Sequence, residues 1–300
     1  MEKLELLNQK YALDGKLAFC QREDGSIYAD VMANGAKAQI LLYGAHLMSF
    51  VPAGEEEVLW MSPEAEFAEG KALRGGVPVC FPWFGPAPFD RNLPKHGFAR
   101  LMEWGMAGSS VLGNGDVKLE MTLESSDDSY FFWPFEFKAV MTFIIGQQLE
   151  ATLTVLNNGS TEMQYSAALH TYFNVGDAAS VSIEGLSGHH FYPNGSTERQ
   201  IQREPFFALE GFVDRCYVHH QQPCLIHDTT MERTIKAAKK GSNVTVLWNP
   251  WEESTRLIHD IPNDGYTNFV CVEAANNFDD TIVLQPGETH QTAIILSVEH

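Results

Sequence analysis

The sequence predicts an all-β protein: one large antiparallel β-sandwich with few, short helices. Apolar and polar residues alternate over most of residues 117–156, and this period of two is typical of antiparallel strands with one buried face. No segment carries a long apolar repeat of 3.6 residues, so the helix content should be low. No internal repeat, low-complexity tract or linker divides the 300 residues, and we therefore expect a single domain spanning residues 1–300.

Residues 16–51 are expected to form short strands joined by turns. Two of these strands, Ser26–Met32 and Lys37–Tyr43, are rich in β-forming residues. They are separated by Asn34-Gly35, a pair that favours a tight hairpin turn.

A helical turn and an irregular loop are expected next. Residues 62–72 predict one or two helical turns, because Ser62 can cap a helix whose first position is Pro63. Residues 73–86 are dense in Gly, Pro and aromatic side chains, so regular structure is not expected there. Residues 94–100 then concentrate positive charge in an otherwise acidic chain.

Strands dominate the rest of the chain. The clearest alternating sets are Val117–Leu123, Phe137–Phe143 and Leu149–Val155. Residues 157–160 are expected to turn the chain into Met163–Leu169, a strand that should deliver His170 to the sheet. Further strands are expected at residues 181–184, 233–237, 243–248, 268–273 and 289–298.

The formal net charge is −19, which opposes binding to nucleic acids and to anionic membranes. An anionic ligand would therefore need a local cluster of Arg and Lys. No stretch approaches the roughly 18 apolar residues of a membrane span, and residues 1–8 do not have the pattern of a signal peptide. The five cysteines are odd in number and widely spaced, without a CxxC pair, which fits reduced thiols in a cytoplasmic protein.

Two residues are candidates for proton transfer. His170 stands among Leu169, Tyr172 and Phe173 in a segment that should be buried. A buried histidine either has hydrogen-bond partners as a structural residue or serves as an acid or base near neutral pH. Glu273 follows an apolar run at the expected end of a strand, where a carboxylate is costly unless it is paired or functional. Taken singly, each residue leaves the structural interpretation open.

Positive charges and a further carboxylate are candidates for ligand binding. Arg74 and Arg100 flank the Gly/Pro/aromatic loop, with Lys95 and His96 close to Arg100, and Arg suits the recognition of phosphate or carboxylate. Solvated charges or ion pairs are the alternative. Asp214 lies in an expected turn, where its carboxylate can accept hydrogen bonds from sugar hydroxyls or from its own backbone.

The eleven histidines invite a metal interpretation that their pattern does not support. The adjacent pairs at residues 189–190 and 219–220 would point to opposite faces of a strand. The sequence has no HExxH motif, no Cys/His array, and no GxGxxG or Walker motif. We therefore expect no metal site and no cofactor.

Seven motifs, in order over residues 73–288, make the sequence resemble the aldose 1-epimerase (galactose mutarotase-like) superfamily, and within it the glucose-6-phosphate 1-epimerases. The motifs are Leu73-Arg74-Gly75-Gly76-Val77-Pro78 with Phe81-Pro82-Trp83-Phe84-Gly85, His96-Gly97-Phe98-Ala99-Arg100, Leu169-His170-Thr171-Tyr172-Phe173, Asp214-Arg215-Cys216-Tyr217, Trp248-Asn249-Pro250, Cys271-Val272-Glu273-Ala274-Ala275-Asn276 and Leu284-Gln285-Pro286-Gly287-Glu288. One such motif would be weak evidence, whereas seven in order are strong.

The resemblance implies a β-supersandwich with a groove across one sheet, with His170 as general acid and Glu273 as general base. The expected substrate contacts are Arg74, Lys95, His96, Arg100 and Asp214. Position 95 is often Gln in this branch and is Lys here, which would add a positive charge near a phosphate.

The implied chemistry suits these residue types. Opening a hexopyranose ring requires removal of the O1 proton and delivery of a proton to the ring oxygen, which an acid–base pair can do. We therefore predict a monomeric enzyme that interconverts the α and β anomers of hexose 6-phosphates, most of all D-glucose 6-phosphate. The alternatives are a mutarotase of free hexoses, a glycoside hydrolase, which normally needs two facing carboxylates, and a carbohydrate-binding protein without activity.

Overall fold

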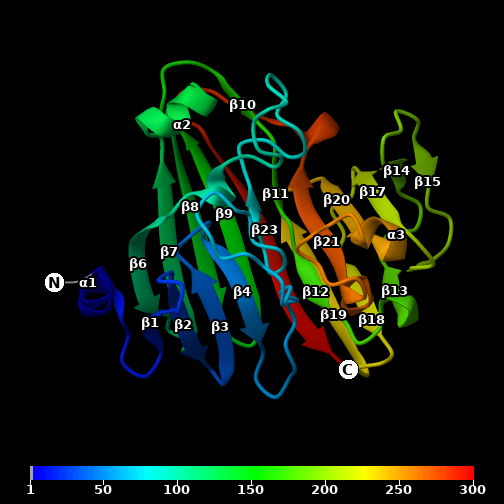
Figure 1. Ribbon diagram of the computed structural model, residues 1–300, viewed down its shortest axis with the longest axis horizontal. Coiled ribbons are helices and arrows are strands. Elements are labelled where there is room, and N and C mark those ends of the chain that lie inside the picture. The colour runs from blue at the N-terminus through cyan, green and yellow to red at the C-terminus, as the bar shows by residue number, and fades with distance from the viewer. Residues whose placement is uncertain (1–2) are drawn as a thin grey trace.

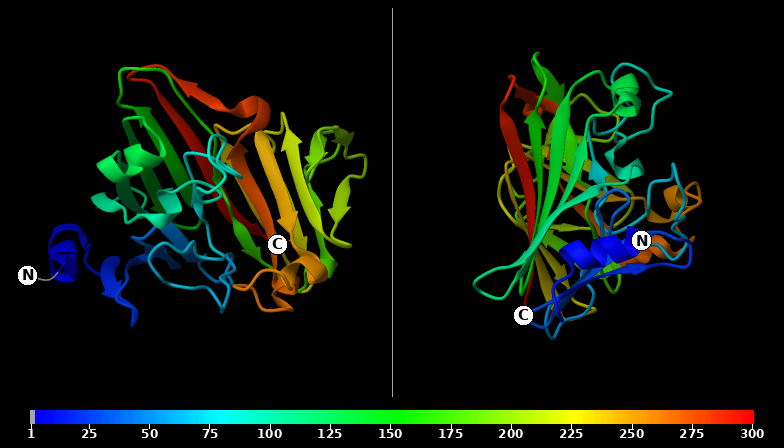
Figure 2. Two further views of the ribbon diagram at one scale, coloured as in Figure 1. Left: turned by 45° about the horizontal axis from the view of Figure 1, so that its top comes forward. Right: turned by 90° about the vertical axis from the view of Figure 1, so that its left-hand side faces the viewer.

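The computed structural model describes residues 3–300, and antiparallel strands make up most of it. A nine-stranded sheet forms one layer, and a four-stranded and an eight-stranded sheet pack against it (Figures 1 and 2). The apolar side chains between these layers form one continuous core. The prediction of a large antiparallel β-sandwich is confirmed.

The bounds of the strands follow the order of the sheets. The nine-stranded sheet runs β16 (Phe206–Ala208), β13 (Val181–Glu184), β18 (Cys224–Asp228), β19 (Arg233–Lys240), β23 (Thr289–Glu299), β9 (Leu149–Asn157), β8 (Phe137–Ile145), β7 (Val117–Glu124) and β6 (Gly105–Val111). The eight-stranded sheet runs β15 (Gln200–Ile201), β14 (His190–Pro193), β17 (Val213–Val218), β20 (Val244–Asn249), β21 (Phe269–Asn276), β11 (Ala167–Leu169) and β5 (Val79–Cys80), with β12 (Tyr172–Asn174) also paired to β21. The four-stranded sheet runs β1 (Leu17–Gln21), β2 (Ile27–Ala33), β3 (Ala36–Leu41) and β4 (His46–Val51), and β10 (Met163–Tyr165) pairs with β22 (Ile282–Leu284).

The two smaller sheets cover different parts of the nine-stranded sheet. In Figure 1 the blue strands β1–β4 lie over β7 and β8, and the yellow and orange strands β17, β20 and β21 lie at the other end. Contacts of β2 and β3 with β7 and β8, and of β11 and β21 with β23, hold the layers together. The candidate site residues of β17, β21 and the segment after β11 therefore share one sheet.

The middle of the nine-stranded sheet agrees with the alternation in the sequence. Along β7, β8 and β9, every second side chain is buried, because one face packs on the core and the other faces outward. The predicted hairpin is also confirmed: Asn34 and Gly35 have φ of 53° and 84°, the positive values that a type I′ turn between two strands requires.

The prediction of few, short helices is confirmed, but it did not place the three α-helices within residues 3–300: α1 (Lys3–Tyr11), α2 (Asp127–Phe132) and α3 (Trp251–Thr255). The helix α1 escapes detection because only Leu7 in it is buried, so its sequence carries little apolar periodicity. The helix α2 begins with a capping box between Ser126 and Ser129, a pairing that usually involves Glu or Gln at the second position. No helix within residues 3–300 has both the length and the apolar character to cross a membrane.

The predicted helix in residues 62–72 is wrong. The amide of Glu64 does donate to Ser62 Oγ at 3.1 Å, as a cap would, but only isolated turns follow. The amide of Ser62 donates to the carbonyl of Arg74 at 3.1 Å. Since the two ends of the segment are tied together, its residues must return as a loop and cannot extend as a helix.

Several strands were missed, and one was divided. The prediction omitted β5, β6, β12, β14–β18 and β22, most of which are short or lie near the edges of their sheets. The expected strand Met163–Leu169 is split at Ser166, because β10 pairs with β22 and β11 pairs with β21 and β5. The short strand Val79–Cys80 interrupts the otherwise irregular loop.

Lys239, on β19, is a buried amine whose titration should affect stability. Its Nζ donates to the carbonyl of Val244 at 2.6 Å and to Ser242 Oγ at 3.2 Å, and burial lowers its pKa to about 7. The unfolded chain, with the ordinary pKa of 10.5, therefore binds more protons between about pH 7 and pH 10.5. This group accordingly makes the free energy of unfolding rise with pH in that window.

We expect Lys239→Met to raise the free energy of unfolding at pH 7 by ~1–2 kcal/mol. The Val244 carbonyl still accepts a hydrogen bond from the Ser242 hydroxyl at 2.9 Å, so the substitution does not leave this carbonyl without a donor. Urea unfolding of both proteins at pH 7 and pH 10 measures the effect, and the gain should shrink at the higher pH. A gain independent of pH would refute the titration argument.

Candidate active site

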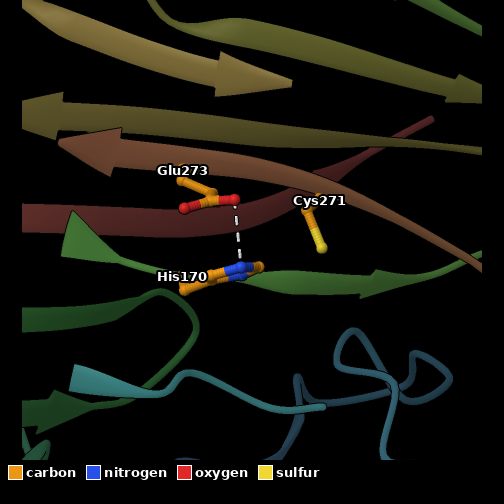
Figure 3. Close-up of side chains that lie close together, drawn as sticks. All are labelled: His170, Cys271 and Glu273. Atoms are coloured by element: carbon orange, nitrogen blue, oxygen red, sulfur yellow. Dashed lines mark ion pairs between the residues drawn. The ribbon is translucent and has the colours of Figure 1, made fainter. Parts of the chain in front are cut away.

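The register of the eight-stranded sheet places His170 opposite Glu273. Ala168 on β11 pairs with Ala275, and Tyr172 on β12 pairs with Cys271. His170 is midway between Ala168 and Tyr172, and Glu273 is midway between Cys271 and Ala275, so the two residues face each other. The Nδ1 atom of His170 lies 3.3 Å from Oε1 of Glu273 (Figure 3). Two residues 103 positions apart in the sequence thus form a direct cross-strand pair.

Glu273 lies within β21, which continues to Asn276, so the expectation that it ends a strand is wrong. Every residue of β21 is buried, because the strand is covered on both faces. The apolar run before Glu273 therefore marks the middle of a covered strand.

The neighbouring strands add further side chains to the same face of the sheet. Asp214 on β17 pairs with Trp248 on β20, which in turn pairs with Cys271 on β21. Side chains directly opposite one another in a sheet share a face, so this row lies beside the row that contains Glu273. Asp214 therefore belongs to a strand and not to the expected turn.

The His170–Glu273 pair is buried, with exposed fractions of 9% and 2%. Burial, reinforced by the Asp214 carboxylate, raises the pKa of Glu273 well above its ordinary value. Burial, reinforced by His96 and nearby arginines including Arg100, lowers the pKa of His170 well below its ordinary value. Both directions favour the neutral forms, so that the pair shares one transferable proton, which can reside on either residue.

Neither residue of the pair has all its polar atoms satisfied. Among the described residues, Nδ1 of His170 and Oε2 of Glu273 are buried without a hydrogen-bond partner. Such orphaned atoms are costly in a folded protein. Because they occur together on two residues that face each other, they indicate a site for a ligand and not a satisfied structural pair.

Aromatic side chains hold the His170 ring in place. The ring of Tyr172 stacks on it at 4.8 Å with an interplanar angle of 9°, and Trp248 and His96 approach it edge-on at 6.0 and 5.9 Å. These contacts restrict the imidazole to one plane, with Nδ1 directed at Glu273.

His96 is held as a neutral hydrogen-bond donor. Its Nδ1 accepts the amide N–H of Gly85 at 3.2 Å, so in the neutral ring the proton is on Nε2. Burial and the neighbouring Arg100 lower its pKa to about 3. The adjacent Gly97 has φ of 74°, and a Cβ there would lie 2.0 Å from the carbonyl oxygen of Phe81. Glycine is therefore required for the loop to bring His96 next to His170.

Arg74 is fully engaged by protein groups. Its guanidinium contacts both carboxylate oxygens of Asp260 at 3.2 Å and donates from Nη1 to the hydroxyl of Tyr172 at 2.9 Å. Asp260 is itself buried, and its carbonyl accepts the hydroxyl of Ser62 at 2.6 Å. This chain of contacts runs from Asp260 through Arg74 to Tyr172, the ring that stacks on His170.

Arg100 differs from Arg74 in lacking a carboxylate partner. Its Nη2 donates to the carbonyl of Lys95 at 2.8 Å, its buried Nε has no partner, and no carboxylate of the described residues lies within 4.0 Å. The Lys95 side chain is exposed and takes part in no ion pair within residues 3–300. Uncompensated positive charge is therefore concentrated at Arg100 and Lys95.

Similarity to known proteins shows the family of this chain. The model of the family described as aldose 1-epimerase matches residues 30–297, nearly the whole sequence. The chain belongs to the aldose 1-epimerase family. This membership confirms the resemblance given by the seven motifs and the predicted enzyme class, an isomerase.

Relatives within the family are similar over most of their length. The chain is 39% identical over 237 residues, 79% of each protein, to a "putative glucose-6-phosphate 1-epimerase" of Salmonella typhimurium. It is 39% identical over 239 residues to the protein of the same name from Escherichia coli, covering 80% of this chain and 79% of that protein. A crystal structure of a "putative mutarotase" from Salmonella typhimurium superimposes with a TM-score of 0.88 at 34% identity, covering 96% of this chain and 95% of the other.

The structure brings most of the expected site residues of this family member together. His170, Glu273, His96 and Asp214 surround one face of the sheet, with Arg100 at its border. Sequence reasoning missed two neighbours of the site residues, Asp260 and Cys271. Asp260 reaches Arg74 across 186 positions, and no motif marks it. Cys271 stands two positions before Glu273, so strand periodicity could have placed both on one face.

Proposed function

We propose that the chain interconverts the α and β anomers of hexose 6-phosphates, with D-glucose 6-phosphate as the main substrate. One observation carries the proposal: a buried acid–base pair, His170 and Glu273 at 3.3 Å, lies beside Arg100, a cation without a carboxylate partner. The names of the relatives from Salmonella typhimurium and Escherichia coli support the same substrate class.

Proton transfer by the pair opens and closes the sugar ring. In the form with the proton on the imidazole, the Glu273 carboxylate takes the O1 proton while His170 gives a proton to the ring oxygen. The C1–O5 bond breaks as the C1–O1 bond becomes the carbonyl of an open-chain aldehyde. Rotation about C1–C2 and reversal of both transfers close the ring from the other face, which inverts the anomeric centre.

The count of protons is the same throughout this cycle. Ring opening leaves Glu273 protonated and His170 neutral, the form that burial favours, and ring closure uses that form. The pair therefore needs no exchange with solvent between the two half-reactions. Each positioned acid or base typically contributes ~10²–10⁴-fold to the rate, which suits a reaction that already proceeds slowly in water.

Binding of the 6-phosphate is assigned to Arg100 and Lys95. A guanidinium can donate two parallel hydrogen bonds to a phosphate, and the exposed Lys95 adds a point charge. Arg74 is assigned a different role, because its charge is already paired with Asp260. It would orient Tyr172 and thereby His170. His96 and Asp214 would bind sugar hydroxyls as donor and acceptor.

The oligomeric state, the compartment and the partners of the enzyme are also proposed. We place a single-domain monomer in the cytoplasm, with a phosphorylated carbohydrate as its ligand and no nucleic acid or membrane partner. The net charge of −19 supports the absence of polyanionic partners. Five unpaired cysteines support a reducing compartment.

Anomer exchange measured by NMR tests the function directly. Glucose 6-phosphate and glucose are compared in parallel, with the protein at catalytic concentration and the spontaneous exchange subtracted. We expect strong acceleration for the phosphosugar and much less for the free hexose. Equal acceleration of both sugars would refute the assignment of the phosphate to Arg100 and Lys95, and acceleration of neither would refute the acid–base mechanism.

A further inference from the structure

Cys271 brings a third metal-binding type of side chain to the catalytic pair. It lies two residues before Glu273 on β21, so both side chains are on one face of the strand. One ligand atom from each of His170, Cys271 and Glu273 lies within 4.8 Å of the other two (Figure 3). The three residues are all buried, so this cluster differs from a group of solvated acids at a surface.

Two atoms of this cluster are without partners. Nδ1 of His170 and Oε2 of Glu273 are buried and make no hydrogen bond to any described residue. A cation bound between them would satisfy both atoms at once. The orphaned atoms are thus an observation, separate from the spacing, that points to a bound ligand.

The set of donors suits zinc. Zn²⁺ is bound in proteins by thiolate, imidazole and carboxylate, with bonds of about 2.0–2.3 Å, and a site with three protein ligands keeps a fourth position open. Bonds of that length at tetrahedral angles place ligand atoms somewhat over 3 Å apart. Nδ1 of His170 and Oε1 of Glu273 are 3.3 Å apart, whereas the three ligand atoms together lie within 4.8 Å of one another, so the side chains must draw closer when a metal binds. One thiolate and one carboxylate would also balance the charge of the ion, which removes the penalty for burying it.

We propose that His170, Cys271 and Glu273 form a reversible Zn²⁺ site, with water in the fourth position, and that zinc bound there blocks epimerase activity. Binding displaces the thiol proton of Cys271 and the proton held by the catalytic pair, and both leave to the solvent. The occupied Nδ1 and carboxylate can then no longer exchange protons with the sugar. The inhibitory effect rests on the proposed function, whereas the binding of zinc does not.

Metal binding is tested first, by calorimetric titration of the EDTA-treated, buffer-exchanged protein with Zn²⁺. We expect one site per chain in the unmodified protein. Cys271→Ala should weaken binding at least ~10-fold. Cys224→Ala, which removes another buried thiol outside the cluster, should bind zinc normally. Equal affinity of the two variants, or the absence of a site in the unmodified protein, would overturn the proposal.

Charge transfer in the cobalt-substituted protein gives a second readout of binding. Co²⁺ added in place of Zn²⁺ should produce a thiolate-to-metal absorption band, because Cys271 supplies a sulfur ligand. The band should be missing in Cys271→Ala and present in Cys224→Ala. A band of unchanged strength in Cys271→Ala would assign the metal to another site and overturn the proposal.

Inhibition is tested with the NMR exchange assay. Zinc should slow the unmodified enzyme, EDTA should restore it, and the metal-free Cys271→Ala enzyme should remain active with at least ~10-fold lower sensitivity to zinc. Unchanged sensitivity in Cys271→Ala would overturn the inhibitory role. If no form of the protein accelerates exchange but zinc binding depends on Cys271, the metal site stands and the proposed function fails.

Discussion

Glu273→Gln should lower the rate of anomer exchange on glucose 6-phosphate by ~10²–10⁴-fold with the fold retained. The amide has nearly the shape of the carboxyl group, so the packing of β21 is preserved. It cannot take the O1 proton, and the cross-strand pair loses the proton that it holds at 3.3 Å from His170. Substrate should still bind, because Arg100 and Lys95 are untouched.

The measurement is the NMR exchange rate under saturating substrate, accompanied by circular dichroism and a direct titration with glucose 6-phosphate. His170→Asn should give a loss of similar size. The double variant should be little worse than either single variant, since two groups that act as a unit do not contribute additively. Exchange near the rate of the unmodified enzyme in Glu273→Gln would contradict the role of Glu273 as the base.

The stability of Glu273→Gln has a pH dependence of known sign. Burial raises the pKa of Glu273, so the folded protein holds this proton more tightly than the unfolded chain. Its contribution to stability is therefore greatest below the unfolded pKa, near 4.5, and declines as the pH rises above it. We expect Glu273→Gln to unfold at a higher temperature than the EDTA-treated parent at pH 8, with a smaller difference at pH 5.

The middle of the nine-stranded sheet could be predicted from the sequence, and much of the eight-stranded sheet could not. Alternation reveals β7, β8 and β9 because one of their faces packs on the core and the other does not. The strand β21 is buried on both faces, so its residues show no alternation. Its length was underestimated for that reason, and Glu273 was expected at a strand end.

The site residues followed from motifs, whereas their partners depend on the fold. Nothing local to Asp260 indicates that it reaches Arg74, since the contact forms only when the loop after α3 meets the loop before β5. The sequence therefore could not reveal that Arg74 and Arg100 differ, the first being paired with a carboxylate and the second not. The roles of His170 and Glu273 themselves remain predictions until the substitutions above are made.

Arg100→Gln should raise the KM for glucose 6-phosphate by ~10–100-fold and change the turnover of free glucose much less. Charge-assisted hydrogen bonds contribute about 1.5–3 kcal/mol each, which corresponds to that range. The guanidinium has no carboxylate partner to leave behind, so its removal should cost binding and not folding. Arg203→Gln, at an exposed arginine without an ion pair among the described residues, is the control for the loss of one charge.

The contrast with Asp260→Asn separates binding from orientation. Asp260 touches Arg74 and not the expected position of the phosphate, so its loss should lower kcat for the phosphosugar and for glucose by similar factors while KM changes little. Steady-state measurements of kcat and KM on both variants, with each sugar, decide which arginine binds the phosphate. If Asp260→Asn raised KM for glucose 6-phosphate alone, Arg74 would be a phosphate ligand. If Arg100→Gln lowered kcat for both sugars equally, Arg100 would act on the catalytic pair, and Lys95 would be left as the only cation for the phosphate.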